Sequence, residues 1–134
     1  MVSLILLTHG DLCSSFFRAA TTMLGDQPDV YCIPTLHLSS NEITKKIKNI
    51  FENSDILKYG AVIAVDLKVG STWNVACKLT RDHDRIAIIS GINLPMLLSF
   101  LTKRESLNFK ELTASLVDAG KRGIEIFNCS VEGS

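Results

Sequence analysis

The chain has 134 residues, of which 46% are hydrophobic and 21% are charged, and its formal net charge at pH 7 is zero. These values are typical of one globular domain, whose core we place at about residues 2–127 with a short tail over 128–134. Without a basic excess, nucleic-acid binding is not expected. The apolar runs are much shorter than the roughly 20 residues that cross a bilayer, and the N-terminus has the pattern of a first strand rather than a signal peptide. We therefore expect a cytoplasmic protein.

Four short apolar runs, bounded by polar or turn-forming residues, predict buried β-strands. They span residues 2–8, 30–34, 61–65 and 85–89. Apolar residues that recur at the spacing of one helix face follow each of these runs. These stripes cover residues 12–23, 43–50, 73–80, 96–101 and 109–127. Strands that alternate with helices of this length predict an α/β fold, a doubly wound and mostly parallel sheet with helices on both faces.

Several helix boundaries have recognisable signals. Ser39 followed by Glu42 has the spacing of a capping box, and Asn108 caps the last helix. Pro95 suits the first turn of a short helix because its missing N–H costs nothing there. The polar stretch over residues 99–108 predicts an exposed connection between the last two helices.

The most informative residue is His9, which follows the first strand directly. The third strand ends on another ionisable residue, Asp66. Ligands and chemistry gather at the carboxyl ends of strands in open α/β sheets. A carboxylate that accepts a hydrogen bond from one ring nitrogen of His9 would fix the tautomer and leave the other nitrogen as a nucleophile.

Two further features at the same edge suit phosphoryl chemistry. Gly70 and Ser71 open a helix, so their backbone N–H groups and the Ser71 hydroxyl offer an anion site. Gly10 leaves room for a partner to approach closely. A purely structural interpretation of these residues also stays open. His9 would then be an ordinary polar loop residue and Asp66 a loop or capping carboxylate. Gly70 and Ser71 would serve only to form the turn.

The other histidines and the cysteines are weaker candidates. His37 falls in a polar loop, and His83 falls in a charged run that is typical of a solvated turn. No pair or cluster has metal-site spacing, so no metal is expected, and free thiols fit a reducing compartment. Cys13 stands out because it lies near a predicted helix start, where a thiol can become reactive.

Taken in order, these residues resemble the IIA component of the mannose-class bacterial sugar phosphotransferase system, from Leu4 to about Phe127. The motifs that carry the resemblance are Leu7-Thr8-His9-Gly10, Leu24-Gly25, Val65-Asp66, Gly70-Ser71 with Asn74, and the long run from Gly91 to Leu97. The resemblance implies that His9 carries the phosphoryl group, that Asp66 orients it and that Ser71 lies near the phosphoryl site.

The resemblance also implies partners. The family takes phosphate from the carrier protein HPr and passes it to a IIB protein or domain, which is linked in turn to membrane IIC and IID components. It needs no metal or organic cofactor. It forms a homodimer in which an antiparallel edge strand is exchanged, and the tail after residue 128 is a candidate for that strand.

One turn departs from the family pattern. The family commonly has Gly-Gly-Ser-Pro after the third strand, and this chain has Val69-Gly70-Ser71-Thr72. Val69 does not adopt a positive φ easily, so we expect a turn of different shape. Thr72 restores the N–H that Pro lacks and adds a hydroxyl. Lys68 places a cation near the phosphoryl site.

Two other functions remain open on the same fold. One is the phosphotransferase subunit that supplies a dihydroxyacetone kinase. The other is a regulatory or binding protein that does not transfer phosphate, and the altered turn keeps this alternative open.

Overall fold

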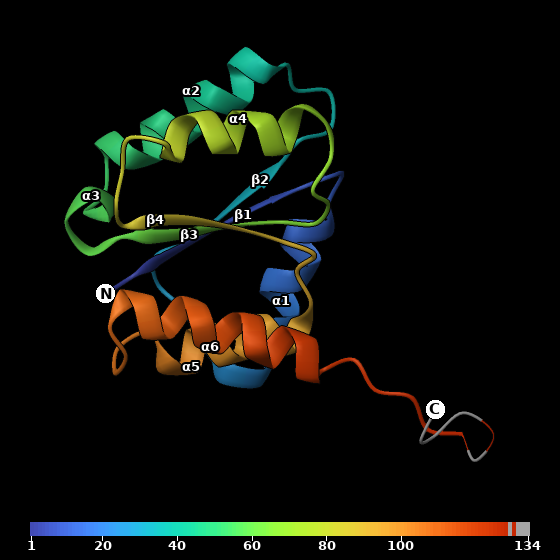
Figure 1. Cartoon of the computed structure of the whole chain (residues 1–134). Helices are drawn as coiled ribbons and strands as arrows, with labels where there is room; N and C mark the ends of the chain where they lie inside the picture. The colour runs from blue at the N-terminus through green and yellow to red at the C-terminus, as the bar shows by residue number, and fades with distance from the viewer. Residues whose placement is uncertain (129, 131–134) are drawn as a thin grey trace.

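The sheet of the computed structural model, which describes residues 1–128 and residue 130, has four parallel strands in the order β2-β1-β3-β4 (Figure 1). The strands are β1 (Ser3–Thr8), β2 (Val30–Pro34), β3 (Ala61–Val65) and β4 (Ile86–Ser90). The parallel sheet is therefore confirmed, and β4 begins one residue later than predicted. The tail that we expected to supply an antiparallel strand lies largely outside the described residues, at 129 and 131–134.

Helices cover both faces of the sheet, as predicted for a doubly wound fold. They are α1 (Leu12–Leu24), α2 (Ser40–Glu52), α3 (Ile56–Tyr59), α4 (Gly70–Thr80), α5 (Leu94–Lys103) and α6 (Phe109–Arg122). One layer contains α2, α3 and α4, and the other contains α1, α5 and α6 (Figure 1). None of the helices in the described part of the chain has the length and apolar character to cross a membrane.

Alternate residues of the central strands enter opposite layers of the core. Leu4 and Leu6 of β1 pack with the α1, α5 and α6 layer, whereas Ile5 and Leu7 pack with the α2, α3 and α4 layer. Both faces of β1 are thus buried, which explains why its sequence is a continuous apolar run rather than an alternating one. The same holds for β3, whose five residues are all buried.

The predicted capping signals are present. The Ser39 hydroxyl accepts a hydrogen bond from the backbone N–H of Glu42 at 3.1 Å, and the Glu42 carboxylate accepts one from the Ser39 N–H at 3.4 Å. The Asn108 side chain accepts from the N–H of Glu111 at 2.8 Å. These bonds satisfy N–H groups that have no partner inside the helix, and they explain why α2 and α6 begin where they do.

The last helix is shorter than its apolar stripe predicted. It ends at Arg122, and Phe127 is 88% exposed instead of continuing the buried face. The segment after Gly123 leads away from the body of the protein (Figure 1). Helix α3 was not predicted, because four residues are too few to show a periodic pattern.

The polar stretch over residues 99–108 is an exposed connection only in part, since Glu105, Ser106 and Asn108 are exposed and the residues before them are not all so. Helix α5 continues to Lys103, and Arg104 is only 4% exposed. The Arg104 guanidinium donates to the carbonyl oxygens of Pro28 at 2.7 Å and Val2 at 3.4 Å, and to Gln27 Oε1 at 3.3 Å. Burial lowers the pKa of Arg104, although Asp29 and Glu105 act in the opposite direction. The charged side chain of Arg104 can be buried here because carbonyl oxygens accept hydrogen bonds from its guanidinium group.

Candidate active site

His9 and Asp66 come together because β1 and β3 are neighbours in register. Leu7 pairs with Val65 at the last rung of the ladder, so the two polar residues follow directly at the same edge of the sheet. His9 begins the loop after β1, and Asp66 begins the loop after β3. These loops lie at the right of Figure 1, where the strands end.

The Asp66 carboxylate holds His9 through both its backbone and its ring. His9 Nδ1 lies 3.0 Å from each carboxylate oxygen, and the His9 backbone N–H donates to Oδ2 at 3.0 Å. The backbone N–H of Leu67 donates to Oδ1 at 3.0 Å. The His9 side chain is 54% exposed, whereas that of Asp66 is 11% exposed. The imidazole is therefore fixed at its inner nitrogen and open to solvent elsewhere.

The electrostatics of the pair determine which ring nitrogen carries the proton. Burial raises the pKa of Asp66, but the hydrogen bonds from the His9 backbone and ring, together with the His9 charge, outweigh it, and the pKa is lowered overall. An ionised carboxylate can only accept hydrogen bonds. Nδ1 of His9 must therefore carry a proton, and in the neutral form of the ring the lone pair is on Nε2.

Thr8 fixes the chain immediately before His9. Its buried hydroxyl accepts a hydrogen bond from the Cys13 N–H at 2.7 Å, at the start of α1. Its carbonyl oxygen accepts from the Thr35 N–H at 3.0 Å and from the Thr35 hydroxyl at 2.9 Å. The sequence analysis did not find this role, because Asp11 occupies the usual capping position and makes no side-chain cap bond.

The altered turn after β3 is accommodated without strain at Val69. Val69 is extended, with φ −142° and ψ 153°, and Gly70 takes the left-handed conformation with φ +79°. Ser71 is exposed and Thr72 is buried. In the described part of the chain, neither Ser71 nor Thr72 forms a hydrogen bond to His9 or Asp66.

Gly10, in the loop after β1, also has a positive φ, 54°, and nothing lies within 4 Å of the position that a Cβ would occupy.

The N-terminus of helix α4 lacks the side-chain hydrogen bond that the other helices starting at this edge have. Side-chain oxygens cap the first turns of α2 and α5, and the Thr8 hydroxyl serves α1. Helix α4 has no side-chain cap and no acidic residue in its first turn. The partial positive charge of its N-terminus is thus free to act on an anion at this edge.

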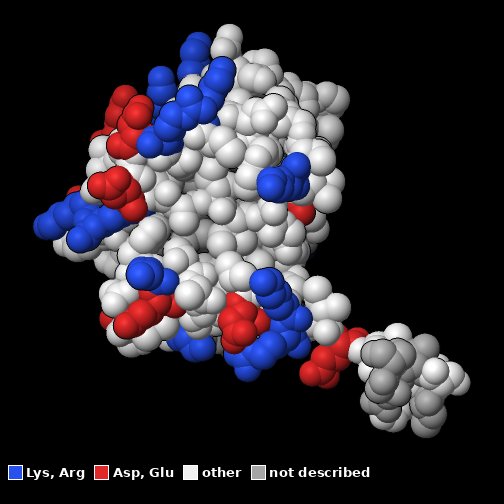
Figure 2. Space-filling view, in the orientation of Figure 1, with Lys and Arg blue, Asp and Glu red and all other residues white. Residues whose placement is uncertain are grey.

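Four exposed apolar side chains lie on the loops and helix start at this edge. We call them the apolar rim: Leu12 (42% exposed), Leu36 (59%), Leu67 (54%) and Val69 (59%). Figure 2 shows that the right side of the molecule, where these loops lie, carries few charged side chains. The sequence analysis did not identify this surface, because exposed apolar residues in loops have no periodic pattern.

The remaining candidates lie elsewhere or have structural roles. His37 is exposed in the loop after β2, and His83 packs edge-on against Phe51, with ring centroids 5.8 Å apart. The Asn93 side chain caps α5 and also donates to the Gly120 carbonyl oxygen at 2.9 Å. Cys13 is fully buried. Within residues 1–128, no three His, Cys, Asp or Glu side chains gather as metal ligands would.

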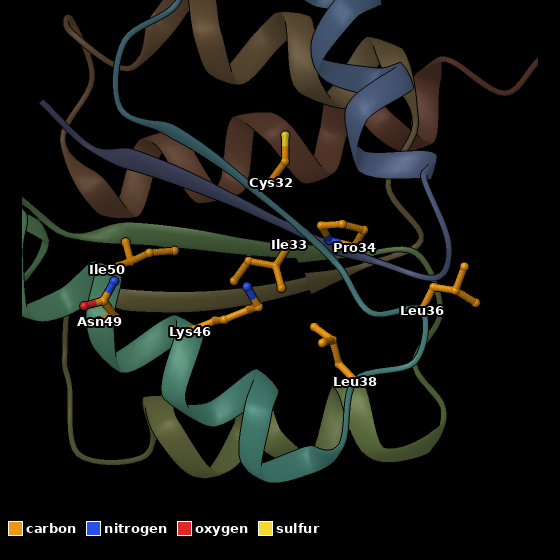
Figure 3. Close-up of a pocket in the computed structure, with 8 residues that line it drawn as sticks. All are labelled: Cys32, Ile33, Pro34, Leu36, Leu38, Lys46, Asn49 and Ile50. Atoms are coloured by element: carbon orange, nitrogen blue, oxygen red, sulfur yellow. The ribbon is translucent and has the colours of Figure 1, made fainter.

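A pocket of about 430 Å³ lies beside β2 and α2 (Figure 3). Its lining residues are Cys32, Ile33, Pro34, Leu36, Leu38, Lys46, Asn49 and Ile50. His9 and Asp66 are not among them. The His9 ring, which is 54% exposed, therefore lies outside this pocket.

Comparison with known proteins agrees with this arrangement. The family model described as "PTS system fructose IIA component" matches residues 3–117. The chain belongs to this family of phosphotransferase-system IIA components. The mannose-specific EIIAB component of Escherichia coli K12 is 29% identical over 126 residues, which are 92% of this chain and 39% of that protein. The fructose-specific EIIA component of Bacillus subtilis 168 is 24% identical over 131 residues, covering 94% of this chain and 86% of that protein.

Solved structures show the same fold. The crystal structure of phosphotransferase component EIIA from Streptococcus agalactiae superimposes with a TM-score of 0.86 at 22% identity, covering 95% of this chain and 98% of that chain. The predicted membership of the mannose and fructose class of sugar-transport IIA components is thus confirmed. The chain spans about two fifths of the length of the E. coli EIIAB protein, whose further activity does not follow from this match.

Proposed function

We propose that the protein is a histidine phosphocarrier: Nε2 of His9 accepts a phosphoryl group from phospho-HPr and passes it to a IIB protein or domain. The observation that carries the proposal is the His9–Asp66 pair, in which Nδ1 is held at 3.0 Å by a carboxylate and the ring is 54% exposed. The relatives named mannose- and fructose-specific support a role in sugar uptake, reached through IIB and the membrane components IIC and IID.

In the proposed transfer the Nε2 lone pair attacks phosphorus in line with the donor's P–N bond. The new P–N bond forms while the donor bond breaks, and the electron pair of the broken bond returns to the donor imidazole. The transition state is loose, so positioning and charge stabilisation supply most of the catalysis. Bond formation makes the His9 ring positive, and the Asp66 carboxylate stabilises that charge. Transfer to IIB reverses these steps, and no metal or organic cofactor takes part.

The neighbouring turn would support the phosphoryl oxygens. We assign this role to the Ser71 hydroxyl and to the backbone N–H groups of Gly70, Ser71 and Thr72 at the uncapped start of α4. Thr72 as a whole residue is only 4% exposed, so its hydroxyl is not assigned a contact and only its N–H counts as part of the helix start. Gly10 keeps the approach to His9 clear, since no atom lies within 4 Å of its missing Cβ. Partners would dock on the apolar rim, which offers uncharged contact surface at the same edge.

The protein would act in the cytoplasm as a single IIA domain over residues 1–134 and as a homodimer. Ile124, Ile126 and Phe127 are 77%, 65% and 88% exposed. Strand β4 pairs only with β3, so its outer edge has no partner strand within the described residues. An exposed apolar segment and an open sheet edge are complementary, and pairing them across two copies would cover both.

The deciding experiment follows phosphoryl transfer from phosphoenolpyruvate through enzyme I and HPr, with intact-protein mass as the readout. The wild-type chain is expected to gain about 80 Da, the mass of one phosphoryl group. His9→Ala is expected to gain nothing, because it lacks the nucleophile. A P–N bond is labile to acid, so brief acid treatment should remove the added mass.

Variants of the other histidines provide matched controls. His37→Asn tolerates the positive φ of 61° at that position, and both His37→Asn and His83→Ala should be phosphorylated like wild type. A gain by His9→Ala would place the phosphoryl group elsewhere. If the wild-type chain gained nothing while still forming a stable partner complex, a regulatory function would replace this proposal.

A further inference from the structure

Lys68 lies in the loop after β3, at the edge of the sheet that carries His9 and Asp66. The loops that follow the four strands cover residues 9–11, 35–39, 66–69 and 91–93, and Lys68 is the single Lys or Arg among them. The other charged residues there are Asp11 and Asp66. Lys68 lies two residues after Asp66, so its Cα is within about 7 Å of the Asp66 Cα. A lysine at this position can reach the space in front of His9 with its long flexible stem.

The ammonium group of Lys68 contacts an aromatic ring instead of an acid. Lys68 Nζ lies 5.6 Å from the centroid of the Trp73 ring, in the first turns of α4. Across the described part of the chain, the ion pairs are His9–Asp66 and Arg122–Asp118, and neither involves Lys68. Asp66 is already occupied by three N–H groups of His9 and Leu67. Lys68 is thus a cation with a weak contact and no competing carboxylate.

We infer that Lys68 is a phosphoryl-binding residue that rests on Trp73 in the unphosphorylated protein and moves to the phosphoryl oxygens when His9 is phosphorylated. This inference rests on the phosphocarrier function proposed above. It concerns two side chains of this protein, Lys68 and Trp73, that the proposed chemistry does not otherwise use.

The charge balance at the edge favours this movement. Before transfer, the four loops carry two carboxylates and one ammonium group. The phosphoryl group adds further negative charge next to Asp66, and no second Lys or Arg lies in the loops to offset it. A charge-assisted hydrogen bond to a phosphoryl oxygen is stronger than an exposed cation–aromatic contact. The lysine should therefore leave the ring when the anion arrives.

The first measurement is the equilibrium of phosphoryl exchange with HPr. Wild type and Lys68→Met are each mixed with phospho-HPr, and intact-protein mass gives the fraction that carries phosphate. Met keeps a similar stem without the charge, so the exchange constant should fall about tenfold, which corresponds to about 1.4 kcal/mol. Lys68→Arg keeps a cation and should restore most of the loss. The difference between wild type and Lys68→Met should shrink near 1 M salt, where exposed charges are screened within about 3 Å.

The second measurement uses the intrinsic fluorescence of Trp73, which is the single tryptophan of the chain. Phosphorylation should change its emission in wild type, because the cation leaves the ring, and should not change it in Lys68→Met. Lys58→Met is the matched control. Lys58 lies over the Tyr59 ring at 5.0 Å on α3, and its removal should leave both readouts as in wild type.

The outcomes separate the two proposals. Phosphorylation of His9 with an unchanged exchange constant and the same emission change in Lys68→Met would overturn the role of Lys68 and leave the phosphocarrier function intact. A wild-type chain that takes no phosphate would overturn both.

Discussion

The Asp66 carboxylate is held from several sides at the edge where the parallel strands end. Its two oxygens accept hydrogen bonds from the backbone and ring of His9 and from the Leu67 N–H. All three donors favour the ionised form, so the same bonds that orient His9 also keep Asp66 charged. In the proposed transfer, orientation of His9 and stabilisation of its positively charged phosphorylated ring would thus depend on one side chain.

Asp66→Asn is expected to reduce the free energy of unfolding by about 1–3 kcal/mol at neutral pH and to slow phosphoryl transfer without abolishing the fold. The higher free energy of unfolding of the wild-type protein should be lost in acid. The folded-state pKa of Asp66 is depressed, so its contribution is fully present above the unfolded pKa, about 3.9, and disappears as the pH falls through the lower folded value.

Urea denaturation of both proteins between pH 7 and pH 2 measures this difference. Titrations of groups that do not contact Asp66 largely cancel in the comparison, and His9→Ala in both backgrounds removes the contribution of the histidine. A stability difference that stayed constant down to the acid end would show that the Asp66 pKa is not depressed.

At the scale of elements, Thr8 connects the start of α1 to His9. The Thr8 hydroxyl binds the first turn of α1, and the Thr8 carbonyl oxygen binds Thr35 in the loop after β2. His9 is the next residue. Its backbone is therefore positioned by three elements at once, β1, α1 and the β2 loop, and its ring by β3.

Thr8→Val should destabilise the protein by about 1–2 kcal/mol. Valine has nearly the same shape, so it fits the fully buried position, but it leaves the Cys13 N–H without its acceptor. Urea denaturation measures the loss. Thr44→Val is the control, because the Thr44 hydroxyl bonds only within its own helix and is partly exposed, and a change within about 0.5 kcal/mol is expected there. Equal effects of the two substitutions would contradict a special role for Thr8.

The elements that could be predicted from the sequence are those with a regular pattern of buried residues or a side-chain cap. Strand β1 and strand β3 are buried on both faces and appear as continuous apolar runs, and α2 and α6 carry side-chain caps. The end of α6 was missed, because Ile124, Ile126 and Phe127 look like core residues although they are exposed. Arg104 was missed for the opposite reason: its burial depends on carbonyl oxygens of residues distant in the sequence.

The meeting of His9 and Asp66 could be expected, because both follow parallel strands and such strands end at one edge. The capping role of Thr8, the apolar rim and the Lys68–Trp73 contact could not. Each depends on how a loop folds back over neighbouring residues, and loop paths have no repeating pattern in the sequence.

The whole molecule places His9 and Asp66 at one edge of the sheet, and the outer side of β4 has no partner strand among the described residues. A groove of about 550 Å³ lies beside β4 and α6, and Ile89 and Val117 contribute apolar surface to it. The exposed segment after α6 begins next to this groove, since Ile124 lines a neighbouring pocket together with Ile89 and Val117. This side of the molecule suits contact with a second copy of the chain.

Light scattering during size-exclusion chromatography is therefore expected to give the mass of a dimer. Replacement of Ile124, Ile126 and Phe127 by serine should shift the protein to a monomer at micromolar concentration, because it removes the apolar area that association would bury. Met23→Ser removes a side chain that is 60% exposed on α1 and should leave the dimer intact. A monomeric wild-type protein would contradict the proposed homodimer.

Arg104 also has a consequence for the order in which this fold can be completed. Its guanidinium binds the Val2 carbonyl oxygen across a sequence separation of 102 residues, and the Pro28 carbonyl oxygen across 76. Synthesis proceeds from the N-terminus, so these oxygens have no donor from Arg104 while the first hundred residues are being made. The hydrogen bonds that Arg104 adds to the amino-terminal end of β1 and to the segment before β2 can therefore form only after the end of α5 has emerged from the ribosome.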